Sequence, residues 1–583
     1  MNVLWLMVVA LVALILGYRY YSRYLAKILG EDPKAQTPAV CMEDGRDYCP
    51  TKSSVVFAHH FASIAGAGPV LGPTMALLYG ALPVWLWAIL GGIFIGAVHD
   101  YVTLFVSIRE KGHSVAEIAR KSLGDAGFAL MIGFTIVLCI LVTSAFLVAS
   151  AVSLTSLVSL DMMKLPADQT LLHTVVKDGV TMGRIGGIAS TSVIVITLFA
   201  PLVGWLNYRK NAPLSLTYPL AIAICLVSIY AGLVVPVHLD IKTWMVLLAL
   251  YSFVAAGVPV WLLLQPRDFT NVFILYGGIL LLIAGSVGAG LNGATIGAPM
   301  MNVAAATPKL GLIWPFLFIT VACGAISGFH ALVAGGTSSK QVTGEVDARR
   351  IGYGGMLLES LLAIGVVVAL CSGIDFADYT KIVFPAQGKS NPILAFALGM
   401  SGLMHQGLHI PMVYGTVFGI LMVEGFIATT LDTAVRINRY LFEELWSIIF
   451  KDPPKIMKTY LFNSGLSVVL MLVLGFTNAF SAIWPIFGTA NQLLAALTLI
   501  TLAAWLAKAG KQYAFAMLPA LFMVVTTVFS LAYLFKRYLA SHNYILLGAT
   551  VVLMVLTVGL VIVAARHWQQ RRPDQKEQMV LSH

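Results

Sequence analysis

Residues 59–73 read HHFASIAGAGPVLGP and contain three glycines, two prolines and two histidines. They lie within the apolar run 56–79, which is long enough to cross a hydrocarbon core about 30 Å thick. In lipid, each unpaired backbone group costs several kcal/mol, so helix breakers are tolerated only where protein or water surrounds them. The stretch therefore indicates a membrane helix that is interrupted inside a helix bundle.

The composition of the whole chain is that of a polytopic membrane protein. Of its 583 residues, 59% are hydrophobic and 11% are charged, which lies outside the range of soluble globular domains. We predict an all-α fold with about 15 transmembrane helices. The apolar runs behind this prediction lie near residues 3–17, 56–79, 83–108, 126–157, 185–206, 214–235, 242–263, 270–290, 311–336, 351–372, 412–436, 458–477, 482–507, 513–535 and 543–565.

Basic residues predict the orientation of the chain. Arg19, Arg23 and Lys27 follow the first apolar run and no basic residue precedes it, so we expect a retained helix with its N-terminus outside the cytoplasm. An odd number of spans then places the C-terminus in the cytoplasm, together with most lysines and arginines. This insertion preference explains the net charge of +10 better than nucleic-acid binding does. Cys41 and Cys49 fall in a cytoplasmic loop, so no disulfide framework is expected.

Two stretches suggest an internal repeat. Residues 62–66, ASIAG, in the second span resemble residues 331–335, ALVAG, in the ninth. Five spans in residues 56–235 begin from the inside and five in residues 311–507 begin from the outside, which is the pattern of an inverted repeat.

The repeat divides the chain into six predicted segments. These are an N-terminal transmembrane helix (1–30), a cytoplasmic loop (31–55), the first five-helix repeat (56–235), an intervening helix hairpin with an outer loop (236–310), the second five-helix repeat (311–507), and two C-terminal helices with a cytoplasmic tail (508–583). Residues 392–410 would invert everything after them if they spanned the membrane. We therefore expect a re-entrant or surface hairpin there, on the outer side.

An interruption at residues 66–69 has two physical interpretations. Freed carbonyls can hold a cation, and the N-terminal end of the second half-helix attracts a carboxylate. Alternatively, the glycines allow close helix packing, as small residues do in most membrane bundles. Breaks at matching positions of two repeats favour a binding site.

Several polar side chains lie inside predicted spans, where ionisable groups are costly and are functional candidates. Asp100, after His99, and Glu359 could each load and release a proton, or could equally be hydrogen-bonded to the backbone of a broken helix. Asn491 and Gln492 could line a substrate path or form hydrogen bonds between helices.

The stretch TTLDTAVR places three threonines, Thr429, Thr430 and Thr433, near a helix end. Their hydroxyls could complete a cation site with carbonyls of the first broken helix, or could bond back to their own helix. Asp432 and Arg436 have the spacing of a local ion pair.

Histidines raise the alternative of a membrane metalloenzyme. His405 and His409 have the spacing of two metal ligands on one helical face. The other candidate ligands are His59, His60, His99 and His330. This interpretation is weak because no HExxH motif occurs and the histidines fall at different predicted depths. The chain also has no phosphate-binding P-loop and no dinucleotide fingerprint, which argues against ATP-driven transport by this chain alone.

Four longer motifs carry a resemblance to a known family: EDGRDYCPTKSSVVFAHHFASIAGAGPVLGP, GAVHDYVTLFVSIREKGHSVAEIA, TTLDTAVR and WPIFGTANQLLAAL. With these motifs in this order, the chain resembles the carbon starvation protein A family of bacterial inner-membrane transporters from about residue 17 to residue 507. The resemblance implies a secondary active carrier related to the amino acid, polyamine and organocation superfamily, whose core is a 5+5 inverted repeat. It also implies uptake of pyruvate, commonly coupled to protons, or of peptides.

We therefore expect a symporter that imports pyruvate or a similar small carboxylate at a site near the membrane midplane. Asp100 and Glu359 are the predicted proton-coupling residues. The predicted substrate-binding residues are His60, Ser63, Gly66, Ala67, Gly68, His330, Gly335, Gly336 and Thr337. If sodium is the coupling ion, its predicted ligands are Ala65, Thr429, Thr430 and Thr433.

We expect no cofactor other than the coupling ion, H+ or Na+, no resident metal, and no partners other than the substrate and the lipid bilayer. The predicted location is the bacterial inner membrane, and no oligomeric state is predicted. A peptide permease is the alternative within the transporter class, and it would need an acidic partner for the peptide amine, such as Glu359. A histidine-liganded membrane enzyme and a nutrient receptor are the alternatives from other classes.

Overall fold

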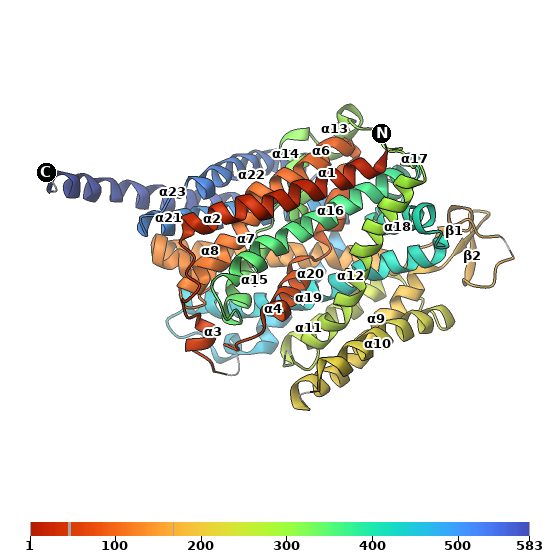
Figure 1. The fold of residues 1–583 in the computed structure, drawn as a ribbon, viewed down its shortest axis with the longest axis horizontal. Coiled ribbons are helices and arrows are strands. Elements are labelled where there is room, and N and C mark those ends of the chain that lie inside the picture. The colour runs from red at the N-terminus through yellow and green to blue at the C-terminus, as the bar shows by residue number, and fades with distance from the viewer. Residues whose placement is uncertain (1, 45–47, 167, 211, 260, 582–583) are drawn as a thin grey trace.

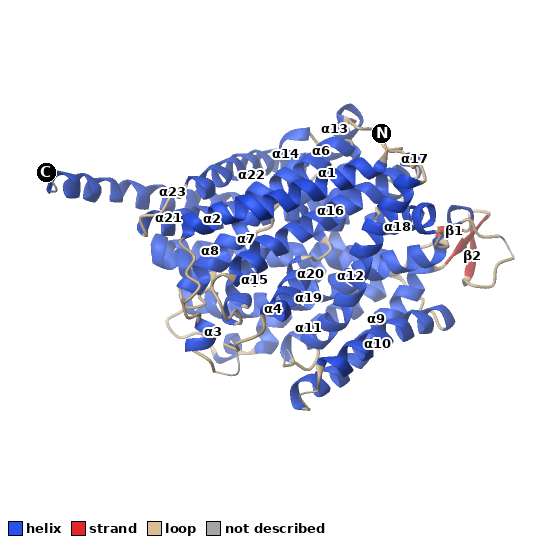
Figure 2. Ribbon diagram, viewed as in Figure 1, coloured by secondary structure: helices blue, strands red, loops and turns tan. Residues whose placement is uncertain are grey.

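The computed structural model describes residues 2–44, 48–166, 168–210, 212–259 and 261–581. The described chain is a bundle of helices with one small β-sheet at its edge (Figure 1, Figure 2). The helices of the first half are α1 (Val3–Leu16), α2 (Ser22–Leu29), α3 (Pro38–Cys41), α4 (Ser53–Ile64), α5 (Gly68–Ala76), α6 (Ala81–Gly91), α7 (Ala97–Arg109), α8 (Val115–Ser153), α9 (Ile185–Gly204), α10 (Leu214–Val234), α11 (Ile241–Gly257) and α12 (Leu264–Leu291).

The second half of the chain is also helical. Its helices are α13 (Val303–Leu310), α14 (Ile313–Val321), α15 (Phe329–Gly336), α16 (Gly354–Ser372), α17 (Phe376–Val383), α18 (Pro392–Leu408), α19 (Met412–Ile449), α20 (Tyr460–Thr477), α21 (Phe480–Lys508), α22 (Ala514–Ala540) and α23 (Tyr544–Leu581). The antiparallel sheet has the strand order β1-β3-β2, with β1 (Val158–Ser159), β2 (Thr174–Lys177) and β3 (Val180–Gly183).

Thirteen helices in the described residues are long and apolar enough to cross a membrane, and the bent pair α4 and α5 makes a fourteenth span. The expected number of about fifteen exceeds this count by one. The remaining expected span, residues 242–263, corresponds to α11, which has 17 residues and lies at the short end of the range for a membrane-spanning helix. At 1.5 Å per residue it is about 26 Å long, a little shorter than the hydrocarbon core.

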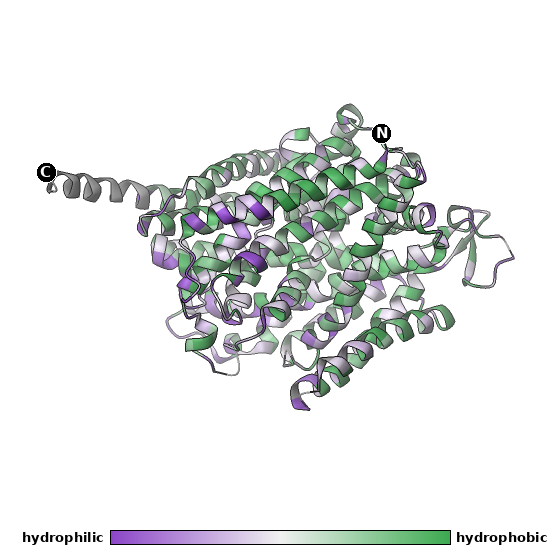
Figure 3. Ribbon diagram, viewed as in Figure 1, coloured by the Kyte–Doolittle hydropathy of each residue, from purple (hydrophilic) through white to green (hydrophobic). Residues whose placement is uncertain are grey.

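The helices end at two opposite faces of the bundle, and the position of the first residues of α1 identifies one of them. The Asn2 side chain donates to the carbonyl of Gly290 (2.8 Å), so α1 begins beside the end of α12. We call this the N-terminal face; in Figure 1 it lies toward the right, with the β-sheet. Residues 30–44, including α3, and residues 48–52 lie at the opposite face, where the strongest hydrophilic colouring also gathers (Figure 3).

Helix α18 lies along the N-terminal face instead of crossing the bundle. At its start, Asn391 caps the Leu394 N–H (3.1 Å) and donates to Ser156 just beyond α8 (2.7 Å). At its end, Gln406 accepts a hydrogen bond from Asn292, next to the end of α12. The expectation that residues 392–410 do not span the membrane fits this placement, but the expected hairpin is instead a single helix. Residues 392–404 are all buried, because α12, α16 and α19 pack around them.

The central helices pack in reciprocal pairs. α8 packs against α20 and α21, and α19 packs against α11 and α12, while α8 and α19 also pack against each other. α9 and α10 form a hairpin at one side of the bundle, in contact with α12. This arrangement positions α8 and α19 beside the interrupted helices.

Candidate functional site

The first interruption lies where the sequence predicts it. α4 ends at Ile64 and α5 begins at Gly68, with a bend of 43° between the two half-helices. Pro69 occupies the first turn of α5, where a missing N–H costs no helical hydrogen bond. The Val70 N–H donates to the carbonyl of Ala67 (3.1 Å), whereas the N–H groups of Ala67 and Gly68 have no hydrogen-bond acceptor among the described residues. These two groups are therefore available to an anion.

The second interruption lies earlier than the short repeat suggests. α14 ends at Val321 and α15 begins at Phe329, and the connecting residues 322–328 read ACGAISG. Ala322 has a φ of 44°, a left-handed conformation that ends α14. Residues 331–335, which resemble residues 62–66, are helical in α15, and the position that matches the break at residues 66–69 is the C-terminal end of α15 at Gly336.

This shift removes three predicted residues from the meeting point of the broken helices. Gly335 and Gly336 are the last residues of α15, and Thr337 follows them as its C-cap. A Cβ on Gly335 would lie 3.3 Å from the carbonyl of His113, in the loop between α7 and α8. The five-residue similarity that suggested these positions is too short to fix the register of the repeat.

The two interruptions meet through glycine. A Cβ on Gly68 would lie 2.5 Å from Cys323 Sγ, and one on Gly72 would overlap the carbonyl oxygen of Val321. Backbones can approach this closely only where side chains are absent. The glycines of residues 59–73 therefore fit both interpretations, a helix break and close helix packing. They interrupt the helix, and they let the two broken helices touch.

A chain of ionisable side chains crosses this meeting point. Asp100 on α7 accepts from His99 Nδ1 through Oδ1 (2.7 Å) and contacts His330 Nδ1 through Oδ2 (2.7 Å). The other ring nitrogen of His330 lies 3.2 Å from Glu359 on α16. Asp100, His330 and Glu359 are fully buried. Both predicted proton-coupling residues thus lie in one cluster, joined by a histidine that was predicted to contact substrate.

The histidines of the cluster have unused hydrogen-bonding capacity. His60 Nδ1 pairs with Ser338 Oγ (2.8 Å), while its Nε2 and the Nε2 of His99 are buried without a partner among the described residues. Both oxygens of Glu359 also lack a hydrogen bond there. Ser63, by contrast, donates to the carbonyl of His59 in its own helix (2.8 Å). A bound substrate or water would satisfy the orphaned atoms of the first three residues.

Asn491 on α21 satisfies the backbone of the second interruption. Its side-chain oxygen accepts from the Phe329 N–H (3.0 Å), and its backbone carbonyl accepts from the Gly328 N–H (3.0 Å). Its amide also donates to Ser327 Oγ (3.1 Å). Of the two roles considered for Asn491, hydrogen bonding between elements is the one that these contacts fit.

The three predicted threonine ligands face different partners. Only Thr430 lies against the first interruption, where its hydroxyl would be 2.9 Å from a Cβ on Gly66. Thr429 donates to Asp268 (2.8 Å), and Thr433 contacts Asp432 (3.4 Å). The predicted sodium site is therefore not assembled in this conformation.

Asp432 pairs with a residue that the sequence analysis did not single out. Arg267 on α12 lies 2.9 Å from Asp432 and donates to Thr429 (3.0 Å), although its side chain is only 1% exposed. The predicted local pair with Arg436 is wrong, because Arg436 donates to the backbone carbonyl of Ala255 (2.9 Å). A buried charge needs an ionic partner more than an exposed one does, and Arg267 is the buried cation here.

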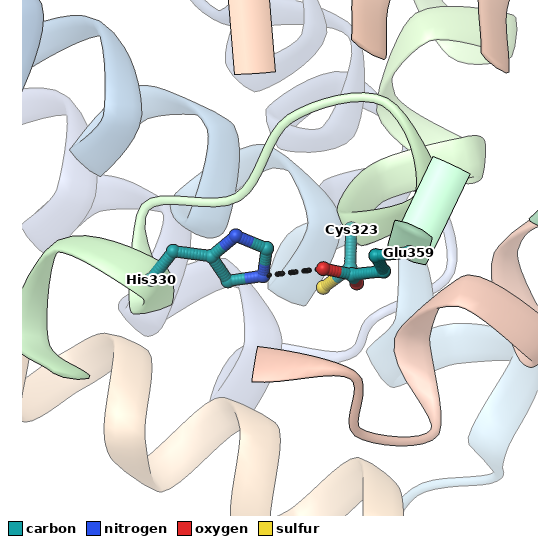
Figure 4. A group of neighbouring side chains, drawn as sticks. All are labelled: Cys323, His330 and Glu359. Carbon is teal, nitrogen blue, oxygen red and sulfur yellow. Dashed lines mark ion pairs between the residues drawn. The ribbon is translucent and has the colours of Figure 1, made fainter. Parts of the chain in front are cut away.

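The metal-binding potential of the cluster lies at Cys323, His330 and Glu359. One ligand atom from each lies within 4.8 Å of the others, and Figure 4 shows the thiol and the carboxylate side by side, facing the imidazole. These are ligand types that bind zinc. However, Asp100 and Glu359 already face the two ring nitrogens of His330. His405 is elsewhere, on α18, where its Nδ1 lies 3.2 Å from the carbonyl of Ile410.

A further buried acid, Glu424 on α19, was missed because it lies in a run of apolar and small residues without a motif. Its side chain is 1% exposed, and Ser150 on α8 donates to one of its oxygens (2.6 Å). Its other oxygen has no hydrogen-bond partner among the described residues. Its position inside an apolar helix was the one available signal.

Charged residues at the opposite face tie the loop after α2 to the rest of the bundle. Glu31 accepts from the Tyr101 hydroxyl (2.5 Å), and Arg109 donates to Glu345 (2.8 Å). Burial raises the pKa of Glu31, and the Tyr101 hydrogen bond and nearby Arg349 only partly oppose this effect.

Two broken helices that meet inside an apolar bundle, with buried ionisable groups at their contact, are the arrangement of membrane transport proteins. The comparison with known sequences is more specific. Residues 2–390 and 377–530 match the family model described as carbon starvation protein CstA. The chain belongs to this family, and it is a transporter and not an enzyme.

Curated relatives carry two names. The peptide transporter CstA of Bacillus subtilis is 30% identical over the full length of both chains. The peptide transporter CstA of Escherichia coli is 31% identical and aligns with 90% of this chain and 80% of its own. The pyruvate/proton symporter BtsT of Escherichia coli is 30% identical and aligns with 91% of this chain and 81% of its own.

Similar solved structures include MhsT in complex with L-phenylalanine, which covers 82% of this chain and 99% of its own with a TM-score of 0.46 and 13% identity. A manganese transporter mutant from Eremococcus coleocola covers 88% of this chain and 96% of its own with a TM-score of 0.42 and 13% identity. These TM-scores are too low to assign a shared fold.

Proposed function

We propose that this transporter imports pyruvate or a similar small carboxylate together with a proton, by alternating access. In this proposal the protein lies in the bacterial inner membrane, with its N-terminal face toward the periplasm and its C-terminus in the cytoplasm. The two half-helices on each side of the contact between Gly68 and Cys323 would move against each other, opening the site first to one face and then to the other.

The observation that carries the proposal is the chain Asp100–His330–Glu359. Its three side chains come from α7, α15 and α16, so a conformational change that moves α15 alters both contacts of His330. A proton bound within such a chain is favoured in one conformation and released in another, which is the thermodynamic requirement for coupling.

The carboxylate of the substrate would bind at the first interruption. Ala67 and Gly68 offer backbone N–H groups at the start of α5, where the helix dipole favours negative charge. The Gly66 N–H donates to the carbonyl of Ile64 (2.7 Å) and would have to release it to join them. His60 Nε2 is buried nearby on α4 without a hydrogen-bond partner in the described part of the chain, and it would supply a further hydrogen bond. The Ser63 hydroxyl could bind the substrate carboxylate only after its hydrogen bond to the carbonyl of His59 breaks.

Sodium is the alternative coupling ion. The contact of Thr430 with Gly66 keeps one predicted ligand beside Ala65, but Thr429 and Thr433 would have to leave Asp268 and Asp432. This rearrangement makes proton coupling the simpler proposal.

A peptide is the alternative substrate, and Glu424 is the observation that favours it. The predicted acidic partner for a peptide amine, Glu359, already faces His330. Glu424 is a buried acid that interacts with the hydroxyls of Ser150 and Ser153 and faces no cation among the described residues.

Uptake of labelled pyruvate into proteoliposomes that contain only this protein tests the proposal. We expect accumulation under an inward proton gradient, and none under a sodium gradient alone. Accumulation that follows the sodium gradient would overturn the proton assignment. Absence of accumulation under either gradient, in protein shown to be folded, would overturn the pyruvate proposal.

A further inference from the structure

We propose that Glu424, together with Ser150 and Ser153, forms a subsite for the ammonium group of a substrate about as long as a dipeptide. The subsite lies between the first interruption and the N-terminal face. This inference rests on the proposed function, since it assumes that the substrate carboxylate binds at the start of α5. It extends that function by naming the group that would select amine-bearing substrates.

Glu424 is a buried acid that forms no ion pair among the described residues. Ser150 donates to its Oε2 (2.6 Å), whereas its Oε1 is buried and unpaired in the described part of the chain. The Ser153 hydroxyl interacts with the same carboxyl group. An ammonium group brings three donors and a positive charge, so it would complement both the unpaired oxygen and the serine hydroxyls.

The other buried acids of the bundle already face cations. Glu359 lies 3.2 Å from His330, and Asp432 lies 2.9 Å from Arg267. Among the described residues, none of the recorded ion pairs includes Glu424. A substrate that carries its own cation is therefore the natural partner for this acid, because a buried charge left unpaired is costly.

The subsite lies on the face of α8 that leads to the first interruption. A Cβ on Gly66 would lie 4.0 Å from the Phe146 ring, so Phe146 marks the level of the break on α8. Ser150 and Ser153 follow it at positions i+4 and i+7, which lie on one face of a helix. On α19, Glu424 lies at the level of Ser150, which donates to it, and Thr430 lies at the level of the break, against Gly66.

The spacing between these levels selects the length of the substrate. Four residues from Phe146 to Ser150 rise about 6 Å, and six residues from Glu424 to Thr430 rise about 9 Å. Two residues of extended peptide span at most about 7 Å. The length of a dipeptide therefore falls between these two rises, whereas a single amino acid, at about half that length, falls short of both and pyruvate occupies only the carboxylate end.

Competition against labelled pyruvate uptake in proteoliposomes tests the subsite with two probes. Dialanine carries the ammonium group, and N-acetyl-dialanine has the same backbone without it. We expect dialanine to inhibit wild-type protein at least tenfold more strongly, which corresponds to about 1.4 kcal/mol. In Glu424→Gln this preference should fall to about one, and in Ser150→Ala it should fall in part. Thr416→Val, about 12 Å away on the same helix, should keep the wild-type preference.

The possible outcomes separate this inference from the proposed function. Equal inhibition by both probes in wild-type protein, or an unchanged preference in Glu424→Gln, would overturn the subsite while leaving pyruvate transport intact. Failure of both probes to inhibit measurable pyruvate uptake would overturn it as well. If no labelled pyruvate is taken up, labelled dialanine is measured directly: uptake that depends on Glu424 supports the subsite, and no uptake overturns both proposals. The wild-type comparison remains decisive even if Glu424→Gln does not fold.

Discussion

Asp100 is held by two histidines from two different helical segments, and this arrangement gives it a role that a purely structural carboxylate would not have. One oxygen contacts His99 on its own helix, and the other contacts His330 just after the second interruption. Any motion of α15 relative to α7 must break or rebuild the second contact. The hydrogen bond between Asp100 and His330 therefore depends on the position of α15.

Asp100→Asn tests this role. Asparagine keeps the size and a hydrogen-bonding oxygen but cannot exchange a proton, so counterflow exchange should persist while proton-driven accumulation is lost. A gradient of one pH unit supplies 1.36 kcal/mol, enough for about tenfold accumulation by wild-type protein, and we expect none by the variant. The measurement is the accumulation of labelled pyruvate in proteoliposomes.

Asp125→Asn, at a side chain that is 82% exposed, is the matched control. Full accumulation by Asp100→Asn would remove Asp100 from the coupling mechanism.

Asn491→Ala tests whether side-chain hydrogen bonds hold the second interruption together. The substitution leaves the buried Phe329 N–H and the Ser327 hydroxyl without this partner, and each unsatisfied group costs about 1–3 kcal/mol. We expect a clear drop in the unfolding temperature of the purified protein. Thr498→Val is the control on the same helix, because the Thr498 hydroxyl has no hydrogen-bond partner among the residues that the structure describes, and it should be neutral or stabilising. Equal stability of both variants would contradict this role.

Some of these residues could be predicted from the sequence, and others could not. Asp100 and Glu359 are visible because an ionisable residue in an apolar run is unusual. Their shared contact with His330 depends on tertiary packing, which no local pattern encodes. Asn491 is visible as a polar residue in an apolar run, whereas Cys323 resembles an ordinary residue of a packed bundle, and the sequence places neither of them at the second interruption.

The two interrupted helices differ in how clearly the sequence marks them. Residues 66–69 combine two glycines with a proline, and the predicted break is confirmed. Residues 322–328 contain no proline, and their break depends on a left-handed alanine and on hydrogen bonds from α21. The sequence therefore predicts that helix breaks exist in this protein but misplaces the second one.

The repeat boundaries remain a prediction, and the packing of the helices suggests a revision. If α8, α11 and α12 correspond to α19, α20 and α21, the contact of α8 with α20 mirrors that of α19 with α11. The contact of α8 with α21 likewise mirrors that of α19 with α12. On this basis we infer that α9 and α10 are the inserted hairpin and that α11 and α12 complete the first repeat.

Gly72→Ala tests the contact between the two broken helices. The added methyl group would overlap the carbonyl of Val321 in α14, and overpacking of this kind typically costs about 1–3 kcal/mol or more. We expect a loss of monodisperse protein, or folded protein that no longer transports. Gly548→Ala in α23 is the control, since nothing lies within 4 Å of its added Cβ. Wild-type behaviour of Gly72→Ala would show that the helices do not approach this closely.

The whole molecule joins its membrane bundle to a charged network at the opposite face. Glu31 links the loop after α2 to Tyr101 on α7, and Arg109 and Glu345 join neighbouring segments.

Glu31 makes the stability of the protein depend on pH in a defined direction. Because burial raises its pKa in the folded state, folding favours the protonated carboxyl. This contribution is fully present below the ordinary pKa of a glutamate, about 4.3, and is lost as the pH rises through the raised value. Glu31→Gln should therefore gain thermal stability relative to wild-type protein as the pH rises from about 4 to 7. A difference that stays constant over this range would contradict the assignment.

Coupled movement of a proton with the substrate is the property that unites the broken helices with the Asp100–His330–Glu359 chain. The most direct measurement is the internal pH of proteoliposomes, reported by a trapped dye, when pyruvate is added outside at zero membrane potential and with no imposed gradient. We predict acidification inside the vesicles, together with uptake of labelled pyruvate, and neither in vesicles without protein. Uptake of pyruvate without acidification would contradict proton coupling through this chain.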